Sequence, residues 1–207
     1  ERMQTLNLPK FKILQKEEGV LREIARDLLP EEIQSPRIQK VLKDMKEALE
    51  SQDDGVAIAA PQIGESLRIF IVSRKVEEII EESKRNKKNI SLAKRTNEQL
   101  PEEIVSKEDI IFINPVIKKI SKERKTVEEG CLSVRYLYGQ VKRSTKATVE
   151  ALDEKGRKFT RGGTGLMAQI FQHEMDHLDG VLFIDKAQNV EEIFPEHLKK
   201  LKSDAKK

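Results

Sequence analysis

The amino-acid sequence predicts a mixed fold in which strands occupy the middle of the chain and helices lie on either side. Three observations predict it: a helical spacing of apolar residues after Ser35, β-branched and apolar runs in the middle, and a second helical segment that ends near Gly180. With 207 residues, the chain has the length of one ordinary domain with a substantial core. We therefore expect a single domain over residues 1–207.

The first clear helix is expected in the segment "SPRIQKVLKDMKEALESQ". Ser35 suits the N-cap and Pro36 suits the first helical position. The apolar residues that follow recur at helical spacing and are Ile38, Val41, Leu42, Met45 and Leu49.

Strands are expected in "LRIFIVS" and "DIIFINPVIKKIS", and "KATVEALDEKGRKFTR" predicts two strands joined by a turn from Asp153 to Gly156. Between the first two runs, residues 76–109 are highly charged and contain few large apolar residues. We expect a surface insertion there, helical in part between Val76 and Ser83. It could cover one rim of a cleft.

The last clear helix is expected from about Thr164, after two glycines, to Asp179 and Gly180, since glycine commonly follows a helix end. Two neighbouring faces are apolar apart from the histidines, so the helix should be largely buried. One face carries Leu166, Ile170, His173 and His177, and the next carries Met167, Phe171, Met175 and Leu178.

This helix contains the segment "QHEMDH", a candidate metal site. His173 and His177 stand one turn apart and can bind one ion, and Glu174 is close enough to act on a bound water. Two hydrogen-bonded histidines on a helix are the alternative. Burial favours the metal, because imidazoles and a carboxylate are costly to desolvate without a cation.

A catalytic site of this kind usually has a third protein ligand. His197 lies in the charged tail and is a poor candidate, whereas Cys131 follows a glycine in "EEGCLSV". A lone cysteine is more often a buried packing residue. The segment "GVAIAAPQIG", from Gly55 to Gly64, has small residues around Gln62 that let another backbone approach, and it fits a tightly packed loop equally well.

Composition excludes several classes. Lys+Arg 39 against Asp+Glu 36 gives a net charge of +3 with mixed signs, which does not suggest nucleic-acid binding. No stretch approaches the roughly 18 to 20 apolar residues of a spanning helix, so we expect no membrane contact. The single Cys131 cannot form an intramolecular disulfide. These features predict a soluble intracellular protein.

Taken together and in this order, "GVAIAAPQ", "EEGCLS" and "QHEMDH" resemble the peptide deformylases, over most of the chain from "KILQKEEGVLREIA" to "GVLFID". The resemblance implies an α+β fold with antiparallel β-sheets around a central helix that carries the HEMDH motif. It implies a metal-dependent hydrolase that removes the formyl group from the N-terminal formyl-methionine of new polypeptides and releases formate. The expected location is the cytoplasm, or an organelle in a eukaryote.

The resemblance also implies roles for individual residues. Glu174 is the catalytic carboxylate, and the side-chain amide of Gln62 and the backbone N–H of Leu132 stabilise the oxyanion. The implied ligands of one divalent ion are Cys131, His173 and His177. Family members usually work best with Fe(II), although Zn, Ni or Co is chemically acceptable at such a site.

An apolar pocket for the methionine side chain is expected beside the metal. Leu166 and Ile170 lie on the histidine face, and Val56 could close the pocket from the opposite side. All three could equally be ordinary core residues. Gly55 and Ala57 flank Val56 in the same wall, and Ala57 stands where the family usually has glycine. The residues "VRYLYG" after "EGCLS" also depart from the commonest version of the family.

Arg143 lies in the strand-like segment "GQVKRS". It is expected to pair with Glu129 and hold the cysteine loop, although both could be free surface charges. Two other functions fit parts of the pattern. Zinc peptidases share the His-Glu-x-x-His spacing but do not require the other two motifs. A deformylase-like protein that only binds peptide or ribosome is the non-enzymatic alternative. The basic tail "PEHLKKLKSDAKK" could contact ribosomal RNA near the tunnel exit, although such lysines are usually solvated.

Overall fold

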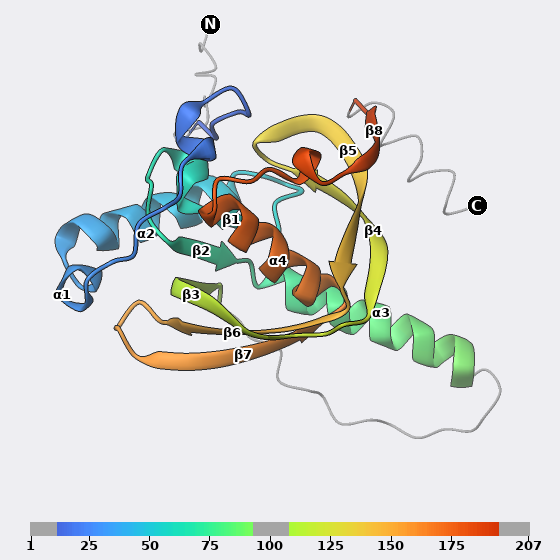
Figure 1. Cartoon of the computed structure of the whole chain (residues 1–207). Coiled ribbons are helices and arrows are strands. Elements are labelled where there is room, and N and C mark those ends of the chain that lie inside the picture. Colours follow the sequence, from blue (N-terminus) through green and yellow to red (C-terminus); the bar gives the residue numbers. More distant parts are fainter. Residues whose placement is uncertain (1–11, 93–107, 195–207) are drawn as a thin grey trace, which may run out of the picture.

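The computed structural model, which describes residues 12–92 and 108–194, contains two antiparallel sheets (Figure 1). The larger sheet has the strand order β1-β2-β3-β6-β7, and the smaller has the order β4-β5-β8. The strands of the larger sheet are β1 Ala57–Ala59, β2 Ile69–Val72, β3 Ile110–Ile120, β6 Lys146–Leu152 and β7 Lys158–Thr164. The strands of the smaller sheet are β4 Arg124–Cys131, β5 Val134–Ser144 and β8 Gln188–Glu192. The predicted α+β fold is confirmed.

Helix α4, Leu166–Leu178, lies between the two sheets (Figure 1). The ring of Phe171 contacts Phe70 of β2 and Phe112 of β3, with ring centroids 6.4 and 5.4 Å apart. The helix ends where Gly180 has a φ of 73°, a left-handed conformation that favours glycine. A Cβ there would also lie 2.7 Å from the carbonyl oxygen of Arg22. The prediction of this helix is confirmed, with a start two residues later than expected.

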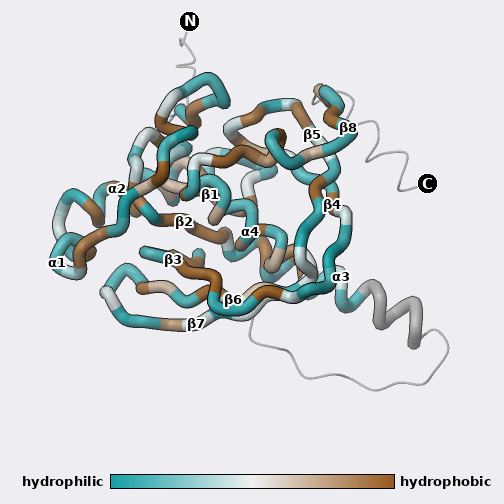
Figure 2. Tube along the Cα trace, in the orientation of Figure 1, coloured by the Kyte–Doolittle hydropathy of each residue, from teal (hydrophilic) through white to brown (hydrophobic). Residues whose placement is uncertain are grey.

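Helix α2, Pro36–Glu50, begins as its sequence predicts. The Oγ of Ser35 accepts a hydrogen bond from the Ile38 N–H at 3.3 Å, and Pro36 occupies the first turn. The apolar face predicted for this helix is buried in the first hydrophobic core, with residues of β2 and β3. Figure 2 shows a continuous hydrophobic stretch along β2, in the middle of the molecule. The short elements are η1 Gly19–Arg22, α1 Pro30–Ile33, η2 Ala60–Ile63 and η3 Phe183–Asp185.

The charged insertion forms a longer helix than the sequence predicts. Helix α3 runs over Lys75–Leu92 and extends away from the sheets in Figure 1. Its first turn is anchored, because Val76 is fully buried and Ile80 packs against the second core beside α4. Residues 93–107 of the insertion lie outside the described part of the chain, as do the basic tail and His197.

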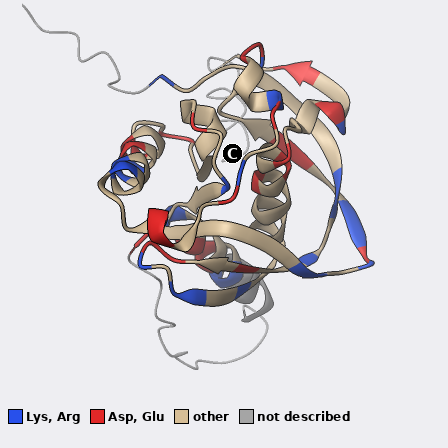
Figure 3. Ribbon diagram, turned by 60° about the vertical axis from the view of Figure 1, so that its left-hand side comes forward, with Lys and Arg blue, Asp and Glu red and all other residues tan. Residues whose placement is uncertain are grey.

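Strands β1, β4 and β8 were not predicted. Strand β4 has the polar sequence "RKTVEEGC", and five of its residues are exposed, so its apolar pattern is weak. Pairing with β5 through Val127 and Val141 holds it in place. Charges of both signs are distributed over several elements (Figure 3). Within the described residues, no helix has the length and apolar character needed to cross a membrane.

Candidate metal centre

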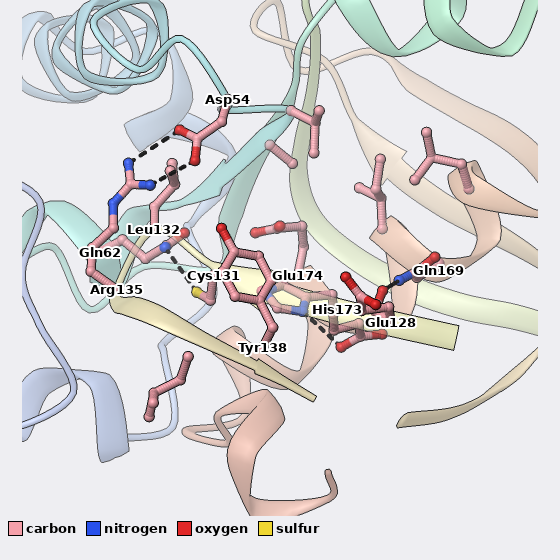
Figure 4. A pocket seen from close by; sticks show the side chains of 18 of the residues that line it. Asp54, Gln62, Glu128, Cys131, Leu132, Arg135, Tyr138, Gln169, His173 and Glu174 are labelled. Carbon is pink, nitrogen blue, oxygen red and sulfur yellow. Dashed lines mark hydrogen bonds and ion pairs between the residues drawn. The ribbon is translucent and has the colours of Figure 1, made fainter. Parts of the chain in front are cut away.

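Three potential metal ligands converge between β4 and α4 (Figure 4 shows two of them, Cys131 and His173). Cys131 is the last residue of β4, and His173 and His177 lie one turn apart on α4. Their ligand atoms all lie within 4.8 Å of one another. The Cys131 Sγ is 3.1 Å from the His177 Nε2, and the two imidazole centroids are 5.0 Å apart. These residues can therefore hold a metal ion.

The electrostatics of Cys131 suit a metal ligand. Burial alone would raise the pKa of this thiol, but the charges of His177 and His173 and their hydrogen bonds outweigh burial and hold the pKa well below its ordinary value. The backbone N–H of Ser133 and the Nε2 of Gln62 also approach the sulfur, at 3.4 and 3.6 Å. A thiolate with two imidazoles is a donor set for a divalent transition metal.

Glu174 is buried beside this cluster, with 4% of its surface exposed. Burial raises the pKa of its carboxyl to about 7, despite the opposing charges of His173 and His177. Within the described residues, its Oε2 has no hydrogen-bond partner. A buried carboxyl that titrates near neutrality and has a free oxygen suits proton transfer, and it fits a site that also takes a cation and a water.

The expected pair of Glu129 and Arg143 is present and buried. The Arg143 Nε and Nη2 donate to the two carboxylate oxygens of Glu129 at 2.7 and 2.8 Å. The side chain of Glu129 is 2% exposed, and that of Arg143 is 6% exposed. Arg143 also donates to Asp176 at 2.7 Å, and Asp176 in turn accepts from Lys186.

Glu129 also contacts a candidate ligand directly, which the sequence did not reveal. Its Oε2 is 3.1 Å from the His173 Nδ1. Burial would raise the pKa of Glu129, but the hydrogen bonds from Arg143 and His173 lower it to about 2. The carboxylate is charged at neutral pH, and it can fix the Nδ1–H of His173 and leave its Nε2 for a metal.

Gln62 is held by both ends of its amide. Its Oε1 accepts from the Ala59 N–H at 2.8 Å, and its Nε2 donates to the Ser133 Oγ at 3.0 Å. The residue lies in η2 and is 1% exposed. The amide N–H₂ therefore points toward the cysteine turn (Figure 4).

A cavity of about 380 Å³ opens beside the cluster. The residues expected to bind substrate or stabilise the oxyanion all line it: Gly55, Val56, Ala57, Gln62, Leu132, Leu166 and Ile170. Cys131, His173, Glu174 and Glu129 line it too, whereas His177 and Arg143 do not. Ala57 pairs with Val72 in the sheet and is not among the described residues with a positive φ. Backbone strain therefore does not explain why the family usually has glycine where this chain has Ala57.

The sequence reasoning missed several residues of the cavity wall. They are Asp54, Glu128, Arg135, Tyr136, Leu137, Tyr138 and Gln169. Four of them lie in "VRYLYG", the stretch noted as a departure from the family, but periodicity gave no sign of where their side chains point. Both tyrosines of the chain line this cavity.

A model of the polypeptide deformylase family matches residues 10–192 of the chain. Peptide deformylase 2 of Clostridium acetobutylicum is 36% identical over 170 residues, which cover 82% of this chain and 89% of that protein. Peptide deformylase 1A, chloroplastic/mitochondrial, of Arabidopsis thaliana is 36% identical over 186 residues, which cover 90% of this chain and 64% of that protein. A crystal structure of class I type b peptide deformylase from Acinetobacter baumannii with bound Met-Ala-Ser is 30% identical, with a TM-score of 0.66, and the match covers 85% of this chain and 97% of that chain.

Proposed function

The chain belongs to the polypeptide deformylase family and removes the formyl group from the N-terminal formyl-methionine of new polypeptides, and we propose that Glu174 performs the proton transfers of this reaction. The observation that carries this assignment is a buried carboxyl, with a pKa of about 7, beside three convergent ligand side chains on one cavity. We also propose that the whole chain works as one catalytic domain, in the cytoplasm or in an organelle.

We propose that Cys131, His173 and His177 hold one divalent ion, Fe(II) in the native enzyme, with Zn, Ni or Co as chemically acceptable replacements. When bound, the ion supplies Lewis acidity that polarises a carbonyl and makes a water nucleophilic at neutral pH. Glu129 positions the His173 ring through its Nδ1, and Arg143 holds Glu129 in place.

Glu174 has two tasks in this proposal. Its carboxylate first accepts a proton from the water that attacks the formyl carbon. The resulting carboxylic acid then delivers that proton to the nitrogen of the leaving amine. A pKa of about 7 suits both directions of transfer at neutral pH, because neither protonation state is strongly favoured.

Gln62 and Leu132 stabilise the oxyanion in this proposal. As the formyl carbon becomes tetrahedral, negative charge develops on its oxygen. We propose that the Gln62 Nε2 and the Leu132 N–H donate hydrogen bonds to this oxygen. The hydrogen bonds that the Gln62 side chain accepts from the Ala59 N–H and donates to the Ser133 Oγ hold the amide in orientation before substrate arrives, so little reorganisation is required.

The inner part of the cavity suits a methionine side chain. Leu166 and Ile170 of α4 line the cavity, as does Val56. A flexible, polarizable thioether fills such an apolar space well. Gly55 and Ala57 complete the wall formed by the segment before η2. We propose that the first residue of the peptide is selected here.

Formate release from formyl-Met-Ala-Ser by anaerobically prepared, metal-loaded protein tests this function. We expect stoichiometric formate and free Met-Ala-Ser, with no cleavage of the unformylated peptide. Internal cleavage would indicate a peptidase. Metal-loaded protein that binds the peptide without releasing formate would indicate a binding protein and would overturn the proposal.

A further inference from the structure

Strand β5 contains a bulge directly after the cysteine turn. Gly130 of β4 pairs with Tyr138, but the next residue, Cys131, pairs with Val134. Residues 135–137 are therefore additional on the β5 side. Bulges of this kind are common next to active sites, where they redirect side chains. All three additional residues line the cavity, as does Tyr138.

Tyr136, in the middle of this bulge, has a backbone conformation that bulky residues rarely adopt. Its φ is 66°, in the left-handed region that favours glycine and asparagine. The residue is 38% exposed, and its ring packs against Phe194, with ring centroids 5.6 Å apart. Such strained conformations persist only where the surrounding structure enforces them, and they cluster at active sites and ligand-binding sites. Here the strained residue lines the cavity.

The bulge is held from both sides. The Arg135 guanidinium donates to the Asp54 carboxylate at 2.7 Å and to the Gln52 Oε1 at 2.6 Å, which connects the bulge to the segment before β1, where Asp54 also lines the cavity. On the outer side, the Tyr136 carbonyl accepts from the Ile193 N–H at 2.7 Å. A surface fixed in this way loses little freedom when a ligand binds.

Tyr138 is fitted against the cysteine turn itself. A Cβ built on Gly130 would lie 2.6 Å from the Tyr138 Cε1, so the ring occupies the space that any other residue at 130 would need. Figure 4 shows this ring between the Arg135–Asp54 pair and His173. Because the charge of Arg135 is matched by Asp54, the two tyrosines give this part of the wall an aromatic character.

We propose that Tyr136 and Tyr138 are specificity-determining residues that contact an apolar side chain at the second or third position of the formylated peptide. The inference rests on the proposed function, which places the first residue beside Leu166 and Ile170. An extended peptide advances by roughly 3.3 Å per residue, so its next two residues must leave past the cavity wall. Aromatic rings there favour apolar or aromatic partners over small polar ones.

The test compares kcat/KM, measured by formate release, for formyl-Met-Ala-Ser, formyl-Met-Phe-Ser and formyl-Met-Ala-Phe. We expect wild-type enzyme to prefer at least one phenylalanine peptide. Tyr136→Asn should reduce that preference roughly threefold to tenfold, mainly through KM, as expected for loss of an aromatic contact. Asparagine tolerates the left-handed conformation, so this variant should fold with unchanged metal content.

Tyr138→Ala should reduce the same preference, and Ile120→Ala is the matched control. Ile120 ends β3, is 49% exposed and does not line the cavity, so its variant should keep the wild-type ratio. If Tyr138→Ala loses metal or fails to fold, Tyr136→Asn decides alone. Equal ratios in wild type and Tyr136→Asn, no preference in wild type, or an equal loss in Ile120→Ala would overturn the inference. Absence of formate from every peptide would instead overturn the proposed function and the inference with it.

Discussion

Replacing Glu129 with glutamine tests whether the buried ion pair holds the metal centre together. Glutamine keeps the shape of the side chain and one acceptor oxygen, but it removes the charge that faces Arg143 and His173. The pKa of Glu129 moves from its ordinary 4.5 to about 2, which corresponds to about 3 kcal/mol of preferential stabilisation of the charged form. This value agrees with the typical cost of breaking a buried ion pair, which is about 3 to 5 kcal/mol.

This stabilisation has a defined pH dependence. A carboxyl with a lowered folded-state pKa contributes its full stability above its unfolded pKa of about 4.5 and loses it as the pH falls toward 2. The free energy of unfolding should therefore differ between wild type and Glu129→Gln by about 3 kcal/mol at pH 7. The difference should fall to less than roughly half by pH 3.

Urea unfolding of chelator-treated protein at pH 7, 5, 4 and 3 measures this difference without a contribution from bound metal. Glu128→Gln is the matched control, because Glu128 is the exposed neighbour on the same strand, and its variant should stay within about 0.5 kcal/mol of wild type. In the metal-loaded protein, Glu129→Gln should also weaken metal affinity by roughly 10- to 100-fold. A difference below about 0.5 kcal/mol, or one that is the same at pH 7 and pH 3, would refute the reasoning.

Three further changes test the proposed reaction. Glu174→Ala should retain one metal ion per chain, as measured by elemental analysis, and its kcat should fall by at least ~10². Loss of the metal in this variant would contradict the assignment of Glu174 as a base that does not bind the metal. Gln62→Leu should keep fold and metal and lower kcat by roughly 10² to 10³, and unchanged turnover would remove Gln62 from the oxyanion site. Ala57→Gly should raise kcat/KM for formyl-Met peptides at constant metal content, because the Ala57 methyl lines the cavity without backbone strain. Equal or lower activity in that variant would show that the methyl does not obstruct substrate.

The parts of the fold that could be predicted are those whose signals are local. Ser35 and Pro36 define the start of α2 through capping chemistry, and Gly180 defines the end of α4 through a left-handed backbone. The histidine spacing likewise needs only one helical turn. Each of these inferences depends on residues within about five positions of one another, so the sequence contains the whole argument.

The parts that could not be predicted depend on pairing across the fold. Strand β4 has too few apolar residues to be recognised, and its position depends on its register with β5. The contact of Glu129 with His173 joins residues 44 positions apart, although the Glu129–Arg143 pair was expected from its place beside the cysteine turn. The bulge at Tyr136 comes from a register shift that no periodicity reveals, so the aromatic part of the cavity wall stayed hidden.

The position of the three ligands has a mechanical consequence. Cys131 terminates a strand of the smaller sheet, and both histidines belong to the helix that packs against the larger one. A bound ion would therefore act as a crosslink between the two halves of the fold, closing a long loop of chain as a disulfide does. Amide hydrogens of the β4–β5 hairpin should then exchange more slowly in metal-loaded protein than in chelated protein, while those of β2 and β3 should change little. The ion that the reaction needs would therefore also hold the cysteine turn against α4.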